Sequence, residues 1–268
     1  MVQTAPVLLL GAGRLGGAIL EGWALTRAFQ PFDLIICDPH PSEAAETAAS
    51  AGARLNPPEA EMARARTVLL AVKPQIWREA AAALAPHLSA EAVVVSVAAG
   101  VRAQDISEAF AGRSAARVMP ITAVSIAQGA GAVFAADPAA RSAAHALFDP
   151  IARIVDVEDE GLMDAVTAIC GSAPAYLYAF IEALEAAGEA EGLSPQAAQT
   201  LARATITGAA ALLAQSGEGP ADLRRQVSSP GGTTEAALKV LMGDAGLGPL
   251  MKQAAAAAAN RSRELSQS

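Results

Sequence analysis

Short apolar runs alternate with alanine-rich segments through the first half of the chain. The runs are rich in Val, Leu and Ile and predict buried strands at Val7–Leu10, Leu34–Cys37, Thr67–Val72 and Val93–Val97. The segments between them predict helices at Leu15–Arg27, Pro41–Ala51 and Gln75–Ala85. Further strands are expected at Ala116–Met119, Ala132–Phe134 and Ile154–Val157, with a helix over Pro138–Phe148. This alternation is typical of an α/β fold with a doubly wound parallel sheet, covered by helices on both faces.

The pattern changes near Val157–Glu160, after which the strand signals stop. Gly, Pro and Ser divide the remainder into helices predicted at Glu160–Gly188, Ser194–Gln215, Ala221–Val227, Thr233–Met242 and Gly246–Leu265. We therefore expect two domains, an α/β domain over residues 1–157 and an all-helical domain over residues 158–268.

The predicted helices of the second half are apolar on more than one face. Leu201–Leu213 contains a single charged residue, Arg203. A helix that is hydrophobic around most of its circumference is normally buried. A helical region of about 110 residues has few places to bury such a surface alone. We therefore expect the helical domain to form a core between the subunits of a homodimer.

Composition argues against several other classes of protein. The 268 residues carry a formal net charge of −8, without the basic stripe that is typical of a nucleic-acid binder. The two cysteines, Cys37 and Cys170, and the three histidines are scattered, so neither a disulfide framework nor a metal site is predicted. The first residues lack the pattern of a signal peptide, and the weakly charged stretch Ala204–Ala214 is too short to span a membrane. We expect a cytoplasmic protein without a membrane partner.

A glycine-rich loop directly follows the first predicted strand. Its residues are Gly11, Ala12, Gly13, Arg14, Leu15 and Gly16. A strand before the loop and a helix after it are the context in which this spacing binds a dinucleotide. Gly11 allows a tight turn, Gly13 allows close approach of a pyrophosphate, and Gly16 allows the helix to pack closely on the strand. The amides and partial positive charge of the helix N-terminus favour the phosphates. A turn with a purely structural role is the alternative.

The ends of the next predicted strands carry residues suited to the rest of such a cofactor. Asp38 lies about 20 residues beyond the loop, where an acid accepts hydrogen bonds from ribose hydroxyls and repels a 2′-phosphate. No Arg or Lys follows it in Pro39–Pro41, which favours NADH over NADPH. A helix cap near Ser42 is the alternative role for Asp38. Strand ends line the ligand crevice of an open α/β sheet, and the residues at the next two ends are Val72, Lys73, Pro74 and Ala99. A solvated side chain is the alternative for Lys73.

A second glycine-rich segment, Val227–Thr234, precedes a helix that is expected near Glu235. Two glycines and several hydroxyls at a helix start suit a carboxylate ligand, because the backbone amides point outward and the helix dipole favours an anion. An N-cap supplied by Thr233 or Thr234 is the alternative. Since a cap needs only one hydroxyl, the whole cluster favours an anion site.

Several motifs along the chain resemble those of pyrroline-5-carboxylate reductases. Ser228–Thr234 (SSPGGTT) is similar to the signature of that family, and Asp164–Tyr176 (DAVTAICGSAPAY) is similar to its first long helix. Other similar blocks are Gly11–Gly16, Leu70–Gln75, Ser96–Val101, Arg117–Pro120 and Asn260–Ser266. The first two blocks are the specific ones, because many families share the nucleotide loop.

The resemblance implies a Rossmann domain followed by a helical dimerisation domain, with dimers that assemble into a larger ring such as a decamer. It implies that NADPH or NADH reduces the imine carbon of 1-pyrroline-5-carboxylate to give L-proline, the last step of proline biosynthesis. It also implies that Asp38 and Pro39 contact the adenosine ribose and that Val72, Lys73 and Ala99 lie along the cofactor. The substrate residues that it implies are Glu160, Ser229, Gly231, Gly232, Thr233 and Thr234. Thr234, which would hydrogen-bond the ring nitrogen, is the predicted catalytic residue.

Two departures from the family pattern leave other activities open. The family usually has Asn and Pro where this chain has Ile121 and Ala123. Loss of a polar residue beside the expected nicotinamide makes a reductase of a different cyclic imine one alternative. A catalytically inactive nucleotide-binding paralogue is the other, although the intact segment Ser229–Thr234 argues against it.

Overall fold

The computed structural model of the protein describes residues 4–267. The chain divides into two compact units, Met1–Gly171 together with Ala258–Ser268, and Ser172–Ala257. The last helix therefore begins in the second unit and ends in the first. The division predicted at residue 158 marks the point where the strands end, and as a domain boundary it stays a prediction.

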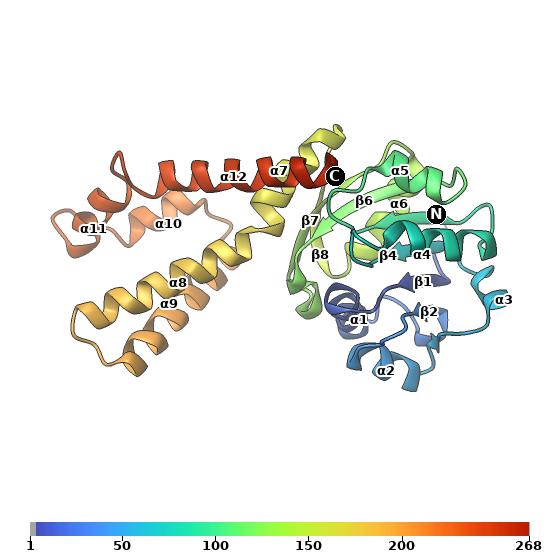
Figure 1. Cartoon of the computed structure of the whole chain (residues 1–268). Coiled ribbons are helices and arrows are strands. Elements are labelled where there is room, and N and C mark those ends of the chain that lie inside the picture. Colours follow the sequence, from blue (N-terminus) through green and yellow to red (C-terminus); the bar gives the residue numbers. More distant parts are fainter. Residues whose placement is uncertain (1–3, 268) are drawn as a thin grey trace. The chain divides into compact units, whose positions relative to one another are not determined.

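An eight-stranded sheet forms the centre of the first unit, in the order β3-β2-β1-β4-β5-β6-β7-β8 (Figure 1). Its strands are β1 (Val7–Leu10), β2 (Leu34–Cys37), β3 (Arg54–Leu55), β4 (Thr67–Leu70), β5 (Val93–Ser96), β6 (Ala115–Pro120), β7 (Gly129–Phe134) and β8 (Ala152–Asp156). Neighbouring strands are parallel except β6 and β7, which pair antiparallel. Residues 121–128 are too few for the crossover that a parallel pair needs. The predicted doubly wound sheet is confirmed, with this one reversal.

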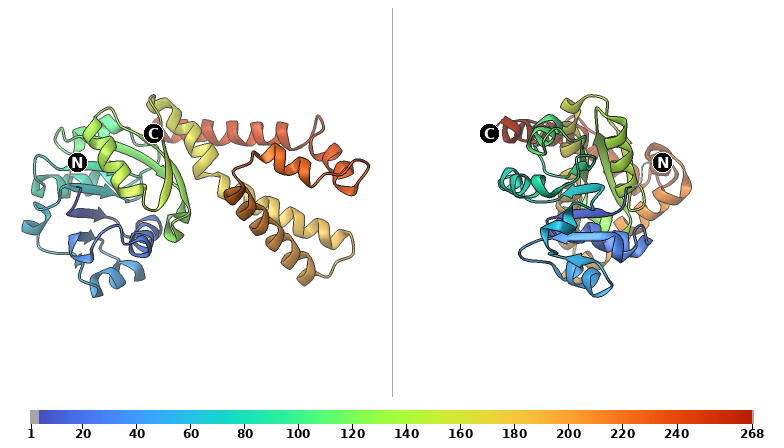
Figure 2. Two further views of the ribbon diagram at one scale, coloured as in Figure 1. Left: turned by 180° about the vertical axis from the view of Figure 1, so that it is seen from behind. Right: turned by 90° about the vertical axis from the view of Figure 1, so that its right-hand side faces the viewer.

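Helices cover both faces of the sheet (Figures 1 and 2). They are α1 (Arg14–Thr26), α2 (Glu43–Ser50), α3 (Glu59–Met62), α4 (Trp77–Leu84), α5 (Ala103–Ala109) and α6 (Pro138–Phe148). Because successive strand residues point to opposite faces, Leu9 and Val95 join the core with α1 and α6, whereas Leu8 and Val94 join the core with α4 and α5. Each such fully buried side chain contributes about 1.5–3 kcal/mol. The two cores explain why the strands are continuous apolar runs.

The long helix predicted over Glu160–Gly188 is interrupted. A 3-10 turn at Glu160–Leu162 leads into α7 (Met163–Val166), a π turn at Thr167–Gly171 and then α8 (Ala173–Ala190). Pro174 in the first turn of α8 has no N–H to donate to the preceding turn, which accounts for the break. The remaining helices are α9 (Pro195–Ser216), α10 (Pro220–Gln226), α11 (Thr233–Leu241) and α12 (Leu247–Gln267).

The second unit leaves much of its apolar surface uncovered. α8, α10 and α11 contain no buried residue, and α9 buries only Ala198 and Ala202.

Glu160–Ala190 is long and apolar enough to cross a membrane by length and composition alone, the one such stretch within residues 4–267. A helix that is covered in a soluble assembly meets the same criterion, so this feature alone is weak evidence for a membrane.

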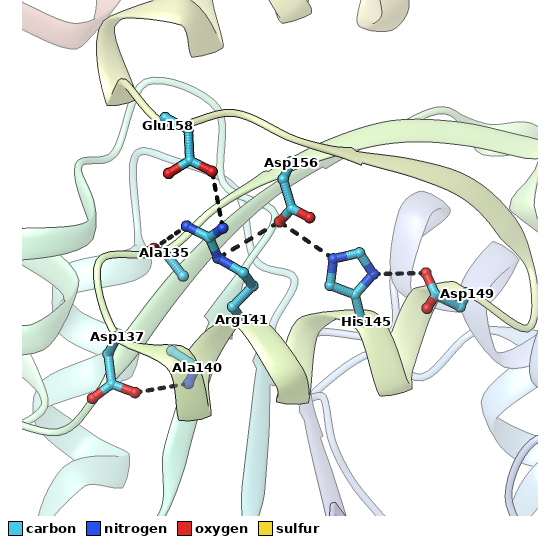
Figure 3. Close-up of polar contacts among 8 residues, drawn as sticks. All are labelled: Ala135, Asp137, Ala140, Arg141, His145, Asp149, Asp156 and Glu158. Carbon is cyan, nitrogen blue, oxygen red and sulfur yellow. Dashed lines mark hydrogen bonds and ion pairs between the residues drawn. The ribbon is translucent and has the colours of Figure 1, made fainter.

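Charged side chains connect α6 to β8, the edge strand of the sheet (Figure 3). Arg141 contacts Asp156 at 3.6 Å and Glu158 at 3.1 Å. His145 faces Asp149 through Nδ1 at 2.9 Å and Asp156 through Nε2 at 3.3 Å. Burial opposes the charged imidazole, but the hydrogen bonds to the two aspartates outweigh it and raise the pKa of His145. Electrostatics therefore contribute to the attachment of α6 at this edge.

Candidate functional site

Two glycines of the nucleotide loop are required by the fold itself. Gly11 has φ +95°, and a Cβ there would lie 2.9 Å from the carbonyl carbon of Ala71. Its N–H donates to the carbonyl of Cys37 at 2.9 Å, which connects the loop to the end of β2. A Cβ on Gly16 would lie 2.1 Å from the carbonyl oxygen of Gly11. A side chain at Gly11 would therefore clash with the backbone that follows β4, and a side chain at Gly16 would clash with the loop itself.

Gly13 differs from both, because nothing lies within 4 Å of the Cβ that it lacks. It is the N-cap residue of α1, no side chain caps that helix end, and its first turn carries no acid. The amides at the start of α1 are therefore open to an anionic ligand. Within the loop, Ala12 is buried, Leu15 is partly buried and Arg14 is exposed. The fold does not require a glycine at position 13, whereas the predicted pyrophosphate does.

Asp38 is held against this loop. Its Oδ2 accepts from the Ala12 N–H at 2.6 Å and its Oδ1 accepts from the His40 N–H at 2.7 Å. Asn56 brackets the same residue, because its amide accepts from the Asp38 N–H at 2.9 Å and donates to the Asp38 carbonyl at 2.8 Å. The N-cap of α2 is Ser42, so the alternative in which Asp38 caps that helix is wrong. Asn56, which directly follows the two-residue strand β3, was not among the residues predicted for the cofactor.

The remaining residues predicted for the cofactor lie at the ends of neighbouring strands. β1 pairs with both β2 and β4 in parallel, so the order of the sheet reverses there and forms the switch point where such sheets bind ligands. Lys73 and Pro74 follow β4 and Ala99 follows β5, and all three are exposed. Val72 is partly buried, and Pro39, after β2, is exposed. Parallel pairing places all these strand ends on the edge of the sheet that carries the glycine loop.

The segment predicted to bind substrate lies in the second unit. Gly232 is the N-cap residue of α11 and no side chain caps the helix, so the alternative cap by Thr233 or Thr234 is not adopted. Thr234 is partly buried, whereas Ser229, Gly231 and Thr233 are exposed. The Gly231 N–H donates to Glu235 Oε2 at 2.5 Å, so a ligand that used this amide would displace the carboxylate. The amides at the start of α11 are open, and their role toward substrate stays a prediction.

Glu160 lies in the first unit, in a set of contacts that the sequence did not predict. Its Oε1 accepts from Arg117 Nη1 at 2.8 Å and from the N–H of Ala103, the first residue of α5, at 2.7 Å. Only 9% of the Arg117 side chain is exposed. A charged residue in the middle of the apolar β6 was the signal that could have identified this cluster. The predicted contact between Glu160 and substrate stays a prediction.

The two cysteines offer little nucleophilic chemistry. Both thiols are free. Burial raises the pKa of Cys37 to about 11, and burial also raises the pKa of Cys170. Because the thiolate is the reactive form, both groups are unreactive at neutral pH.

Comparison with known proteins covers both halves of the chain. Residues 160–265 match the family model described as pyrroline-5-carboxylate reductase dimerisation, and residues 6–100 match one described as NADP oxidoreductase coenzyme F420-dependent. The pyrroline-5-carboxylate reductase of Pseudomonas aeruginosa is 35% identical over 99% of this chain and 98% of its own length. That of Synechocystis sp. is 36% identical over 96% of this chain and 97% of its own length.

Solved structures are similar over the same extent. A pyrroline-5-carboxylate reductase from Coxiella burnetii matches with a TM-score of 0.88 and 28% identity, covering 98% of this chain and 99% of that one. The Plasmodium falciparum pyrroline carboxylate reductase with NADP bound shares the fold, with a TM-score of 0.82 and 23% identity over 99% of this chain and 100% of that one. On the strength of relatives this similar over nearly their whole length, the chain belongs to the pyrroline-5-carboxylate reductase family of oxidoreductases.

Proposed function

We propose that this protein reduces 1-pyrroline-5-carboxylate to L-proline with NADPH or NADH, as the last step of proline biosynthesis. The observation that carries the proposal is the 35% identity to a reductase of that name over both halves of the chain. The cofactor supplies a hydride from C4 of its dihydronicotinamide. The hydride and its electron pair form the new C–H bond at the imine carbon, and the C=N π electrons go to the protonated ring nitrogen.

The residues of this chain bind and orient the reactants in this proposal. The start of α1 and the loop Gly11–Gly16 bind the pyrophosphate, Asp38 and Pro39 contact the ribose, and Val72–Pro74 and Ala99 lie along the nicotinamide half. The open amides of α11, with Ser229, Gly231, Gly232 and Thr233, hold the substrate carboxylate, and Glu160 lies near the substrate. A protonated imine is already electrophilic at carbon, so, unlike a ketone, it needs no proton delivered to its heteroatom as the hydride arrives. Thr234 then acts by orienting the ring nitrogen through its hydroxyl.

For the coenzyme we propose a preference for NADH. The Asp38 carboxylate is held by the N–H groups of Ala12 and His40, so it is not free to turn away from a 2′-phosphate. A fixed negative charge there disfavours NADPH more than NADH. The counter-observations are the NADP oxidoreductase model that matches residues 6–100 and the NADP in the Plasmodium falciparum structure.

We further propose a cytoplasmic homodimer through the helical domain that assembles into a larger ring such as a decamer. The match to a dimerisation model and the uncovered apolar surfaces of α8–α11 support the dimer. Sedimentation equilibrium of the full chain measures the assembly. A mass of ten subunits is expected, and a dimer as the largest species contradicts the ring.

The test of the activity is loss of NADH absorbance, and separately of NADPH absorbance, with 1-pyrroline-5-carboxylate as substrate. Rapid oxidation with a higher kcat/KM for NADH is expected. Ile121 favours a second candidate, reduction of another cyclic imine, because this partly buried apolar side chain follows β6 where the family has Asn. Turnover of a six-membered cyclic imine without turnover of the five-membered one would establish that candidate. NADH binding without turnover of any imine would instead indicate an inactive paralogue.

A further inference from the structure

A polar cavity of about 390 Å³ lies within the first unit, outside the nucleotide loop. Several short stretches, far apart in the sequence, line it: the start of α5, the middle of β6, the 3-10 turn at Glu160–Leu162 with the start of α7, and the last turns of α12. Its lining includes three arginines, two acids and a serine: Arg102, Arg117, Arg263, Glu160, Asp164 and Ser266. Of these, only Glu160 belongs to the predicted substrate site.

The arginine side chains of this cavity have more N–H donors than they use. A guanidinium carries five N–H donors. Arg117 is buried and donates one hydrogen bond, to Glu160. Among the side chains that the structure describes, the Arg263 guanidinium donates only to Asn260, and the Arg102 guanidinium has no hydrogen bond or ion pair. Because a guanidinium fork matches a planar pair of oxygens, these donors favour a carboxylate as the acceptor.

The two acids of the cavity each have a spare oxygen. Glu160 uses Oε1 for Arg117 and Ala103. Asp164 uses Oδ1 to accept from the buried Ser262 at 2.6 Å. Neither Glu160 Oε2 nor Asp164 Oδ2 has a hydrogen-bond partner among the side chains that the structure describes. These oxygens are acceptors for an ammonium group.

We propose that this cavity binds a free α-amino acid as a zwitterion. The carboxylate would lie with Arg102 and Arg263, and the ammonium would lie with Asp164 and Glu160. A polyphosphate would be repelled by the two acids, and a simple cation would be repelled by the three arginines. A ligand with one group of each sign satisfies both sets.

A ligand in the cavity would affect the loop that follows β5. Arg102 ends that loop, which also carries Ala99 and Gly100. Ser266 lies against Gly100, where an added Cβ would be 3.2 Å from Ser266 Oγ. We therefore expect a bound amino acid to change the apparent KM for the coenzyme, a consequence that rests on the proposed function. The binding itself does not depend on that function.

Isothermal titration of the full chain without coenzyme tests the binding, with L-alanine, L-glutamate and L-proline as probes. Acetate and methylammonium each carry one half of the zwitterion and are the half-ligand controls. The variants are Arg102→Gln and Arg263→Gln, both at exposed positions, and Arg153→Gln is the matched control on β8. Thr234→Ala separates this cavity from the predicted reductase site, where L-proline would bind as product.

Saturable binding of at least one amino acid is expected, weakened about tenfold by Arg102→Gln and by Arg263→Gln but not by Arg153→Gln or Thr234→Ala. Absence of binding by all three probes would overturn the proposal. So would binding that both arginine variants retain in full, binding that only Thr234→Ala removes, or acetate binding as tightly as the amino acid. None of these outcomes depends on whether the protein turns over an imine, so failure of this proposal is distinct from failure of the reductase activity.

Discussion

The two units of this molecule differ in how far they bury their apolar side chains. In the first unit, Leu9 and Val95 are no more than 1% exposed, and every strand from β1 to β6 packs against helices of the same chain. In the second unit, Leu201 and Tyr178 are 55% and 63% exposed, and three of the helices bury nothing. The first unit is complete within one chain, whereas the second presents a surface for another copy.

This difference separates two sources of stability. The first unit gains its hydrophobic free energy during folding of a single chain. The second gains much of its own only on association, so its stability depends on protein concentration. Both tryptophans of the chain, Trp23 and Trp77, lie in the first unit, so their fluorescence reports on that unit alone. The contrast can therefore be tested one unit at a time.

The largest effect is expected from Leu201→Glu on α9. A carboxylate buried without a partner between subunits costs about 3 kcal/mol or more, which weakens association by roughly a hundredfold. Light scattering coupled to gel filtration measures the loss of the dimer. The matched control is Leu25→Glu on α1, because Leu25 is 62% exposed in the first unit and should tolerate the charge. Equal oligomers for the two variants would place Leu201 outside the subunit contact.

A second contrast divides the glycines of the nucleotide loop. Gly13→Val should leave the folding of the first unit unchanged, since nothing lies within 4 Å of its added Cβ, but should weaken NADH binding at least about a hundredfold by filling the pyrophosphate space. Gly16→Val should instead destabilise the first unit by about 1–3 kcal/mol, because its Cβ would meet the Gly11 carbonyl.

Tryptophan fluorescence during denaturation and fluorescence titration with NADH measure these two quantities separately. Wild-type affinity for NADH in Gly13→Val would mean that this loop does not bind the phosphates. Wild-type stability in Gly16→Val would mean that the close approach of α1 to the loop relaxes without cost.

Thr234→Ala should slow the reaction without weakening NADH binding, whereas Gly13→Val should weaken NADH binding. Loss of the hydroxyl that orients the imine nitrogen should lower kcat/KM for 1-pyrroline-5-carboxylate about 10- to 100-fold, while the Kd for NADH stays unchanged. Thr234→Ser keeps the hydroxyl and is expected to recover most of the rate. Steady-state kinetics with both variants decide the matter, and a full rate in Thr234→Ala would remove this residue from the reaction.

The fold of the first unit could be predicted largely from the sequence, because strands that are buried on both faces produce unmistakable apolar runs. β1 and β2 have the predicted bounds, as does α6, which Asp137 caps and which begins at Pro138. β3, α3 and α5 were missed. With two and four residues, β3 and α3 are too short to show a period. The long helix was overextended across Pro174, although proline at a helix start is a known signal.

The candidate site was less predictable, because it depends on contacts between segments that are far apart in the sequence. The strand ends and the glycine loop could be located, since parallel pairing brings them to one edge of the sheet. The bracketing of Asp38 by Asn56 and the contact of Glu160 with Arg117 join residues that no local pattern connects. The carboxylate of Glu235 on the Gly231 amide is local, but it depends on a rotamer that sequence does not specify.

The smallest expected effect lies at the edge of the first unit, where His145 connects α6 to β8. Because hydrogen bonds to Asp149 and Asp156 outweigh burial and raise its pKa, the charged imidazole stabilises the folded state. That contribution is complete below the unfolded pKa of about 6.5 and is lost as the pH rises through the higher folded pKa. His145→Gln should therefore lower the free energy of unfolding of the first unit by under about 1 kcal/mol near pH 6 and by less near pH 8.5.

Denaturation followed by tryptophan fluorescence measures this free energy, with dissociation of the oligomer as the control that should not change. A cost that is equal at both pH values would mean that His145 is neutral in the folded protein and that its attachment to β8 is not electrostatic.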